Sequence, residues 1–229
     1  MAARKKVFCA YRLWAAVVAL SLATARLEAR ADNPSDGVRT FDGQMSYIEF
    51  RFVSPSITLD SVEGSTRKIW RSGARYMRLQ EAPDPQRHLH ELVIINEPDV
   101  WMLNLIDNVA KHIVDPGPTY NAHFPVFQNE SKRLTGLEFG REQEFFAASN
   151  AHPSPDEVID GVNCSVQTLD LESSTVRLYL RRSTGLPFQV SIVNARHAYA
   201  VRYDRYEPRL PLEPALFMAP VGAKIVEGK

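Results

Sequence analysis

Residues 176–194, VRLYLRRSTGLPFQVSIVN, decide the fold because two strand patterns flank one turn signal. Apolar and polar residues alternate on both sides of Ser183, Thr184 and Gly185, as in strands that bury one face. Pro187 stands at a strand start, where its missing N–H does little harm. We therefore expect a β-hairpin. One face of it should carry the apolar side chains Val176, Leu178, Leu180, Phe188, Val190 and Ile192.

The same alternation extends outward from this hairpin and predicts two antiparallel meanders, because short turns join sequential strands. The second meander comprises strand patterns at 162–171, 174–182, 186–194 and 196–207. The first comprises patterns at 45–53, 65–73 and 74–82, and three more within 89–115.

The chain between the meanders breaks this pattern. Residues 116–136 hold three prolines and show no sustained period, and residues 137–149 are the best helix candidate despite Gly140. Residues 150–161 are expected to be a polar linker, and residues 216–218 a short edge segment. The fold class is therefore mainly β (α+β). We expect a single curved antiparallel sheet that forms an incomplete β-barrel, with residues 116–149 as a partly helical lid.

The N-terminus has the parts of a secretory signal. Arg4, Lys5 and Lys6 precede an apolar stretch at 13–23, which is about half of the ~20 residues that a membrane span needs. Small residues offer two cleavage sites, after Ala25 and after Ala31, and we favour the second. This predicts a signal peptide at 1–31, one domain at 32–229 and a periplasmic location; the alternative is a short membrane anchor.

Charge and cysteine content argue against nucleic-acid binding and against an internal disulfide. The chain holds 27 basic and 27 acidic residues, and removing residues 1–31 takes away six basic residues and one acidic residue. The remaining acidic chain lacks the clustered Lys and Arg of nucleic-acid-binding proteins. Cys164 is then the only cysteine, so the domain has no internal disulfide and depends on its core.

No catalytic motif is present. The sequence lacks a Gly-x-Ser-x-Gly elbow and a Gly-rich phosphate loop. Cys164 lies on an alternating strand with Val162 and Val166 on its own side, which favours a small buried residue over a reactive thiolate. His88 and His90 have a spacing that can ligate zinc or copper, but the same pattern is common on solvated strands. We expect no enzyme activity, no metal and no cofactor.

Several stretches resemble the LolA superfamily of periplasmic lipoprotein carriers, which includes outer-membrane lipoprotein-sorting and envelope stress-sensor proteins. They are IWRSGARYMRLQEA (69–82), VWMLNLIDNVAKHIVD (100–115), DGVNCSVQTLDL (160–171), VRLYLRRSTGLPFQV (176–190) and LFMAPVGAKI (216–225). The resemblance covers residues 44–223 and implies an incomplete β-barrel around an apolar hollow that is lidded by helices and holds acyl chains. Only residues 32–43 are available here for the helix that precedes the first strand in that family.

These observations lead to two functional hypotheses. The first is an exported, non-enzymatic carrier or sensor that binds lipid or lipoprotein acyl chains, with Arg182 at the rim as the head-group candidate. The second is a structural or regulatory module with a filled core and an envelope protein partner. The candidate cavity residues are Phe50, Phe52, Trp70, Trp101, Leu103, Phe145, Phe146, Leu178, Leu180, Phe188, Val190 and Tyr199.

Overall fold

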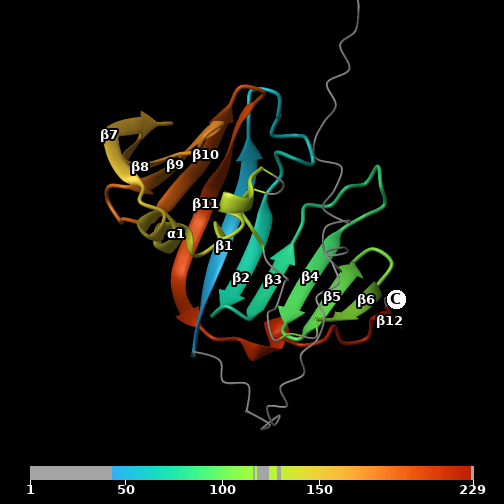
Figure 1. The fold of residues 1–229 in the computed structure, drawn as a ribbon. Coiled ribbons are helices and arrows are strands. Elements are labelled where there is room, and N and C mark those ends of the chain that lie inside the picture. The colour runs from blue at the N-terminus through green and yellow to red at the C-terminus, as the bar shows by residue number, and fades with distance from the viewer. Residues whose placement is uncertain (1–42, 116, 118–123, 128–129, 228–229) are drawn as a thin grey trace, which may run out of the picture. The chain divides into compact units, whose positions relative to one another are not determined.

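The computed structural model describes residues 43–115, 117, 124–127 and 130–227 (Figure 1). The chain divides into two units, residues 1–40 and 41–229, and all described residues belong to the second unit. The predicted signal peptide at 1–31 lies outside the described residues. Within the described part of the chain, no helix has both the length and the apolar character to span a membrane.

Twelve strands form one sheet in the order β12-β6-β5-β4-β3-β2-β1-β11-β10-β9-β8-β7. The first meander comprises β1 (Gln44–Val53), β2 (Arg67–Ser72), β3 (Tyr76–Gln80), β4 (Glu91–Asn96), β5 (Asp99–Asn104) and β6 (Val109–Val114). The second comprises β7 (His152–Ile159), β8 (Val162–Asp170), β9 (Ser174–Arg181), β10 (Pro187–Asn194) and β11 (Ala198–Pro211). Both predicted meanders are confirmed.

Pairing between β1 and β11 joins the two meanders at the middle of the sheet (Figure 1). Phe50 lies opposite Tyr203 and Phe52 lies opposite Val201, so aromatic and β-branched side chains meet across the junction. Among the described residues, β7 and β12 (Lys224–Glu227) pair on one side only, so the sheet does not close. The predicted open β-sheet with a short helix is confirmed.

The hairpin of β9 and β10 forms as predicted. Val190 pairs with Leu178, and Ile192 pairs with Val176, around a turn in which Gly185 has a φ of +71°. This left-handed backbone conformation carries little steric cost for glycine, so the turn signal in the sequence had a physical basis.

Two elements between the meanders differ from expectation. The helix α1 spans Glu142–Ala148 instead of 137–149, because Gly140 has a φ of +83° and interrupts the helical backbone. The predicted linker at 150–161 is wrong, since strand β7 runs through it. Pro153 and Pro155 disguise this strand, and both are tolerated because β7 is an edge strand.

The C-terminal segment also corrects the sequence analysis. Residues expected to form an edge segment lie in the 3-10 helix η2 (Pro214–Phe217) and at Met218 after it. Phe217 is fully buried, contacts Tyr76 edge to face and accepts a hydrogen bond from Asn96 Nδ2 at 3.1 Å. The edge strand is β12, which pairs in parallel with β6 and was not predicted.

Apolar residues are buried on both faces of the sheet. We call the face that carries Ile48, Phe50 and Phe52 the covered face. On the other face, Leu92, Ile94 and neighbouring side chains form one cluster, and further clusters form around Cys164 and Phe217. The fold therefore has apolar packing on two sides of the sheet, and only one of these sides carries the predicted lid.

Candidate functional site

The covered face is roofed by residues 124–148, which we call the cover segment; its residues 128–129 are not described. It contains the 3-10 helix η1 (Lys132–Leu134) and α1, and it crosses the sheet in the region of β1 and β11 (Figure 1). Its buried apolar side chains are at most 4% exposed. They are Phe124, Val126, Phe127, Leu134, Leu137, Phe139 and Phe146.

Phe139 of the cover segment packs on aromatic side chains of the sheet. Its ring centroid lies 4.3 Å from that of Phe50 and 6.2 Å, edge to face, from that of Tyr203. The following residue, Gly140, brings its backbone against β1 and β2. A Cβ atom at this position would lie 3.4 Å from Arg71 Cδ and 3.5 Å from Ser46 Oγ. Glycine therefore suits both the positive φ and the close approach.

Arg71 on β2 bonds the cover segment to the sheet. Its guanidinium donates to the Phe139 carbonyl at 2.8 Å and to Glu138 Oε2 at 2.7 Å, while Nε donates to the Gly73 carbonyl at 2.9 Å. The side chains of Arg71 and Glu138 are only 4% and 7% exposed. Because burial removes competing water, these charged contacts fix the position of the segment.

Glu142, the first residue of α1, makes a second polar connection. It accepts hydrogen bonds from Tyr203 Oη at 2.7 Å, Tyr206 Oη at 3.0 Å and the Gly140 amide at 2.9 Å. Burial raises the pKa of the Glu142 carboxyl, and these hydrogen bonds oppose that shift. Burial likewise raises the pKa of Tyr203, with the neighbouring Glu142 carboxylate adding to it.

A third polar connection lies at the β10–β11 turn. Glu130 accepts from Tyr199 Oη at 3.2 Å and from Asn194 Nδ2 at 3.4 Å, and His197 Nε2 lies 2.9 Å from Glu130 Oε1. Phe127 packs edge to face on Tyr199 beside this group. Side-chain contacts at Arg71, at Glu142 and at Glu130 thus attach the cover segment to the sheet, and Gln143 Nε2 of α1 adds a hydrogen bond to the Gly185 carbonyl of the β9–β10 turn at 2.6 Å.

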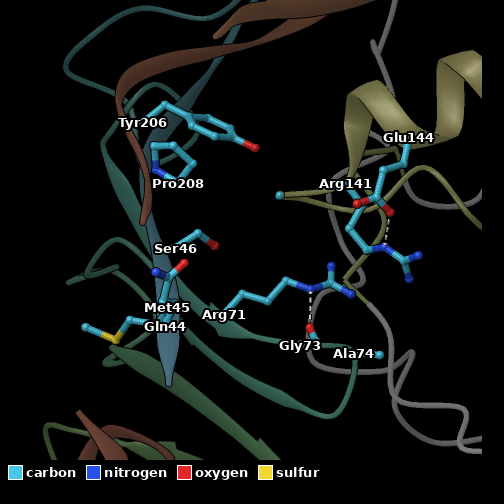
Figure 2. Close-up of a pocket in the computed structure, with 11 residues that line it drawn as sticks. Gln44, Met45, Ser46, Arg71, Gly73, Ala74, Arg141, Glu144, Tyr206 and Pro208 are labelled. Carbon is cyan, nitrogen blue, oxygen red and sulfur yellow. Dashed lines mark hydrogen bonds and ion pairs between the residues drawn. The ribbon is translucent and has the colours of Figure 1, made fainter. Parts of the chain in front are cut away.

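A pocket of about 450 Å³ opens beside the Arg71 connection (Figure 2). Arg71 reaches toward Gly73 on one side of it, and the Arg141–Glu144 ion pair at 2.9 Å lies near the start of α1. The rest of the lining comes from β1, β11, the β2–β3 turn and the cover segment. It comprises Gln44, Met45, Ser46, Ala74, Gly140, Tyr206 and Pro208.

The strand register places part of the predicted cavity set on the covered face. Phe50, Phe52, Leu178 and Val190 are buried there, and Leu180 and Tyr199 are partly exposed on the same face. Phe145 and Phe146 belong to α1, where Phe146 is fully buried and Phe145 is partly exposed. These eight residues lie on the covered face or in the cover segment. Whether they bind a ligand stays a prediction.

Four other predicted residues lie on the opposite face. Trp70 pairs with Tyr47, one residue away from Ile48, and packs near Phe217. Trp101 and Leu103 pack with Leu92, Ile94 and Ala110. Successive strand residues point to opposite faces, so these three do not share a face with Phe50.

Phe188 departs from the expected hairpin face for a different reason. The register of β9 and β10 shifts between Pro187 and Gln189, which marks a β-bulge. The extra residue turns Phe188 toward Cys164, Val166 and Tyr179 on the opposite face. The guanidinium groups of Arg181 and Arg202 lie 4.2 and 4.4 Å from its ring centroid.

The head-group candidate, Arg182, is engaged in an ion pair. Its Nε and Nη2 donate to the two carboxylate oxygens of Asp156 at 2.8 and 2.5 Å, and both side chains are more than half exposed. Nearby Asp156 raises the pKa of Arg182 through this contact. Arg182 therefore lies beside strand β7, in the turn whose Gly185 carbonyl accepts a hydrogen bond from Gln143 of α1 at 2.6 Å.

The two histidines considered for metal binding and the cysteine considered as a nucleophile contact neighbouring residues of the fold. His88 Nε2 lies 3.0 Å from Asp107 Oδ1, and His90 Nε2 lies 3.2 Å from Gln80 Nε2. The described residues contain no group of three His, Cys, Asp or Glu side chains that would hold a metal ion. Cys164 is fully buried, and burial raises the pKa of its thiol.

Arg71, Glu142 and Glu130 were not singled out from the sequence. Their partners lie 61 to 69 residues away for the bonds to Phe139, Tyr203 and Tyr199, so no local motif reveals them. The only local signal is Gly140 inside an otherwise helical pattern, which marks a close backbone approach.

No protein-family model and no curated protein matches the chain. Among solved structures, an uncharacterized conserved protein from Thermus thermophilus has a TM-score of 0.47 at 9% identity, with 81% of this chain and 91% of that chain covered. MucB in its complex with MucA from Pseudomonas aeruginosa has a TM-score of 0.40 at 16% identity, with 80% and 58% covered. This chain therefore spans 58% of that MucB chain.

A LolA superfamily protein from Nitrosomonas europaea also matches, with a TM-score of 0.31 at 11% identity and with 77% of this chain and 90% of that chain covered. The matched structures thus include the superfamily that the sequence resembles. Similarity at this level concerns the fold and carries no inference about ligand or partner.

Proposed function

We propose that this chain is an exported, non-enzymatic protein that binds an acyl chain of a lipid or lipoprotein between the covered face and the cover segment. The observation that carries this proposal is the way in which the apolar face is roofed. The cover segment is separate from the strands of the sheet and is attached to it by side chains of Arg71, Glu142, Glu130 and Gln143. Among its described residues, the one β-bridge joins Pro125 and Glu138 within the segment itself. Displacing the segment leaves the hydrogen bonds of the twelve-stranded sheet intact.

The free energy lost when the cover segment leaves the sheet is comparable to that gained when an acyl chain takes its place. Exposing seven buried apolar side chains of the cover segment costs roughly 1.5–3 kcal/mol each, or about 10–20 kcal/mol. A chain of about 16 methylene groups, at ~0.8 kcal/mol for each buried group, recovers about 13 kcal/mol. An acyl chain can therefore replace the cover segment on the sheet without a large net cost.

The test is native mass spectrometry of protein isolated from the cell envelope, followed by solvent extraction and thermal denaturation with added fatty acid or lysolipid. Copurifying lipid and a raised melting temperature are expected, because a ligand that binds only the folded state stabilises it. Glu130→Gln should speed lipid exchange by weakening one attachment. Glu157→Gln, which removes the exposed partner of Arg177, is the matched control and should leave exchange unchanged.

A second candidate function is a structural or regulatory module with a filled core. It is favoured by one specific observation, since Phe50, Phe139 and Phe146 are each fully buried against neighbouring side chains. Ligand-free protein from the envelope, with no thermal shift on adding lipids, would support this module and reject the carrier.

A further inference from the structure

The two edges of the sheet are built differently. At the β7 edge, Pro153 and Pro155 lack N–H groups, and the register with β8 shifts between Ser154 and Glu157. Glu157 on this edge also forms an ion pair, with Arg177 at 3.2 Å. Prolines, bulges and charges on an edge strand prevent further strands from adding to it. The β7 edge is therefore protected against other chains.

The β12 edge has neither a proline nor a register shift among its described residues. Its register with β6 is continuous over four residue pairs, and it contains no proline. Ile225 and Val226 are 49% and 48% exposed, and Val114 at the end of β6 is 55% exposed. The edge thus combines a regular backbone with apolar side chains that face solvent.

The backbone pairing shows which groups the edge presents. The Lys224 amide donates to the Asn108 carbonyl at 2.9 Å, and Lys224 pairs with Val109. In a parallel ladder, the N–H and C=O of one residue point to the same neighbour, and those of the next residue point away from it. Ile225 and Glu227 therefore direct their backbone donors and acceptors outward, away from β6.

The charged residues that β6 and β12 carry on one face of this edge are basic. Lys224 lies on the face shared by Val109, and Lys111 lies beside Val226 on that same face. Both lysines are exposed, and neither forms an ion pair with another described residue. A complementary strand would therefore combine apolar residues with acidic ones.

We propose that β12 is a docking edge for an extended, acidic and apolar segment of another protein, which adds to the sheet as a further strand. Main-chain hydrogen bonds to Ile225 and Glu227 would hold the segment. Lys111 and Lys224 would select acidic side chains on one face of the segment, and Ile225 would select apolar ones on the other face. Lys111 and Val226 share the covered face by register, but strands β2 to β6 separate this edge from β1 and β11, where the cover segment lies. The proposal therefore stands whether or not lipid binds under the cover segment.

The probe is a fluorescein-labelled eight-residue peptide of alternating Val and Glu, with a matched peptide of Val and Lys, titrated into the full chain by fluorescence anisotropy. Because attraction replaces repulsion at two lysines, the acidic peptide should bind at least about tenfold more tightly. The double variant Lys111→Glu, Lys224→Glu should reverse this preference. Equal binding of the two peptides, or binding of neither, would overturn the proposal.

The backbone part of the proposal is tested with Ile225→Pro and its matched control Ile225→Ala. Proline removes an outward N–H and spares the bonds to β6. It should therefore weaken binding of the acidic peptide roughly three- to tenfold relative to alanine. Equal binding by the two variants would contradict strand addition. Thermal unfolding of both variants checks the fold, and the charge reversal still decides the matter if proline unfolds β12. Concentration-dependent dimers in sedimentation, lost in Ile225→Pro, would instead assign the edge to a second copy.

Discussion

The buried contact between Arg71 and Glu138 should dominate the attachment of the cover segment. Arg71→Met keeps the apolar stem and removes the guanidinium, so Glu138 Oε2 loses a charged donor at 2.7 Å and the Phe139 carbonyl loses one at 2.8 Å. Breaking one side of a buried ion pair costs about 3–5 kcal/mol, because the other charge stays in a region of low dielectric. That is a large part of the ~5–15 kcal/mol by which a domain is stable.

A double-mutant cycle separates this coupling from the loss of packing. Arg71→Met, Glu138→Gln and the double variant are compared by urea denaturation, and the double variant should be at least about 2 kcal/mol more stable than the sum of the two single effects predicts. The control cycle uses Arg182→Met and Asp156→Asn, a pair of the same chemistry with more than half of each side chain exposed. Its coupling should stay within about 0.2–1 kcal/mol. Additive effects at Arg71 and Glu138 would refute the reasoning.

Three further predictions follow from single features. Gly140→Ala should lower the unfolding free energy by about 1–3 kcal/mol, and by more than Gly161→Ala, because both glycines have a positive φ but only Gly140 has atoms within 4 Å of the added Cβ. Burial raises the pKa of Glu91, so this residue stabilises the folded state below the ordinary glutamate pKa, and that stabilisation is lost as the pH rises through the raised pKa. Glu91→Gln should therefore increase the free energy of unfolding in urea at pH 7.5 but not at pH 4.5. The buried Cys164 should react with a thiol reagent at least about a hundredfold more slowly in the native protein than in guanidinium chloride, and equal rates would contradict its burial.

Local patterns predicted the parts of the fold that depend on neighbouring residues. The β9–β10 hairpin followed from alternation and a turn glycine, and both meanders followed from the same period. Strand β7 was missed because Pro153 and Pro155 hide its alternation, although an edge strand accepts both. Phe188 was placed on the wrong face because one extra residue in a bulge leaves the sequence period unchanged.

The candidate site depended more on long-range contacts. Phe50, Phe52, Leu178 and Val190 could be placed on one face from alternation alone. By contrast, an aromatic residue in an alternating strand gives no sign of which face is covered, so Trp70 and Trp101 were included with the wrong set. Arg71 and Glu142 are anchored by groups more than 60 residues away, which only the folded chain brings together.

The most direct test of the central claim is photocrosslinking with a diazirine-bearing fatty acid, followed by peptide mapping. If an acyl chain lies between sheet and cover segment, labelled peptides should contain Phe50, Val190 or Phe139, and unlabelled palmitate should compete with the labelling. Labelling confined to peptides around Trp101 and Phe188, on the opposite face, or labelling that palmitate does not reduce, would contradict the proposed binding site.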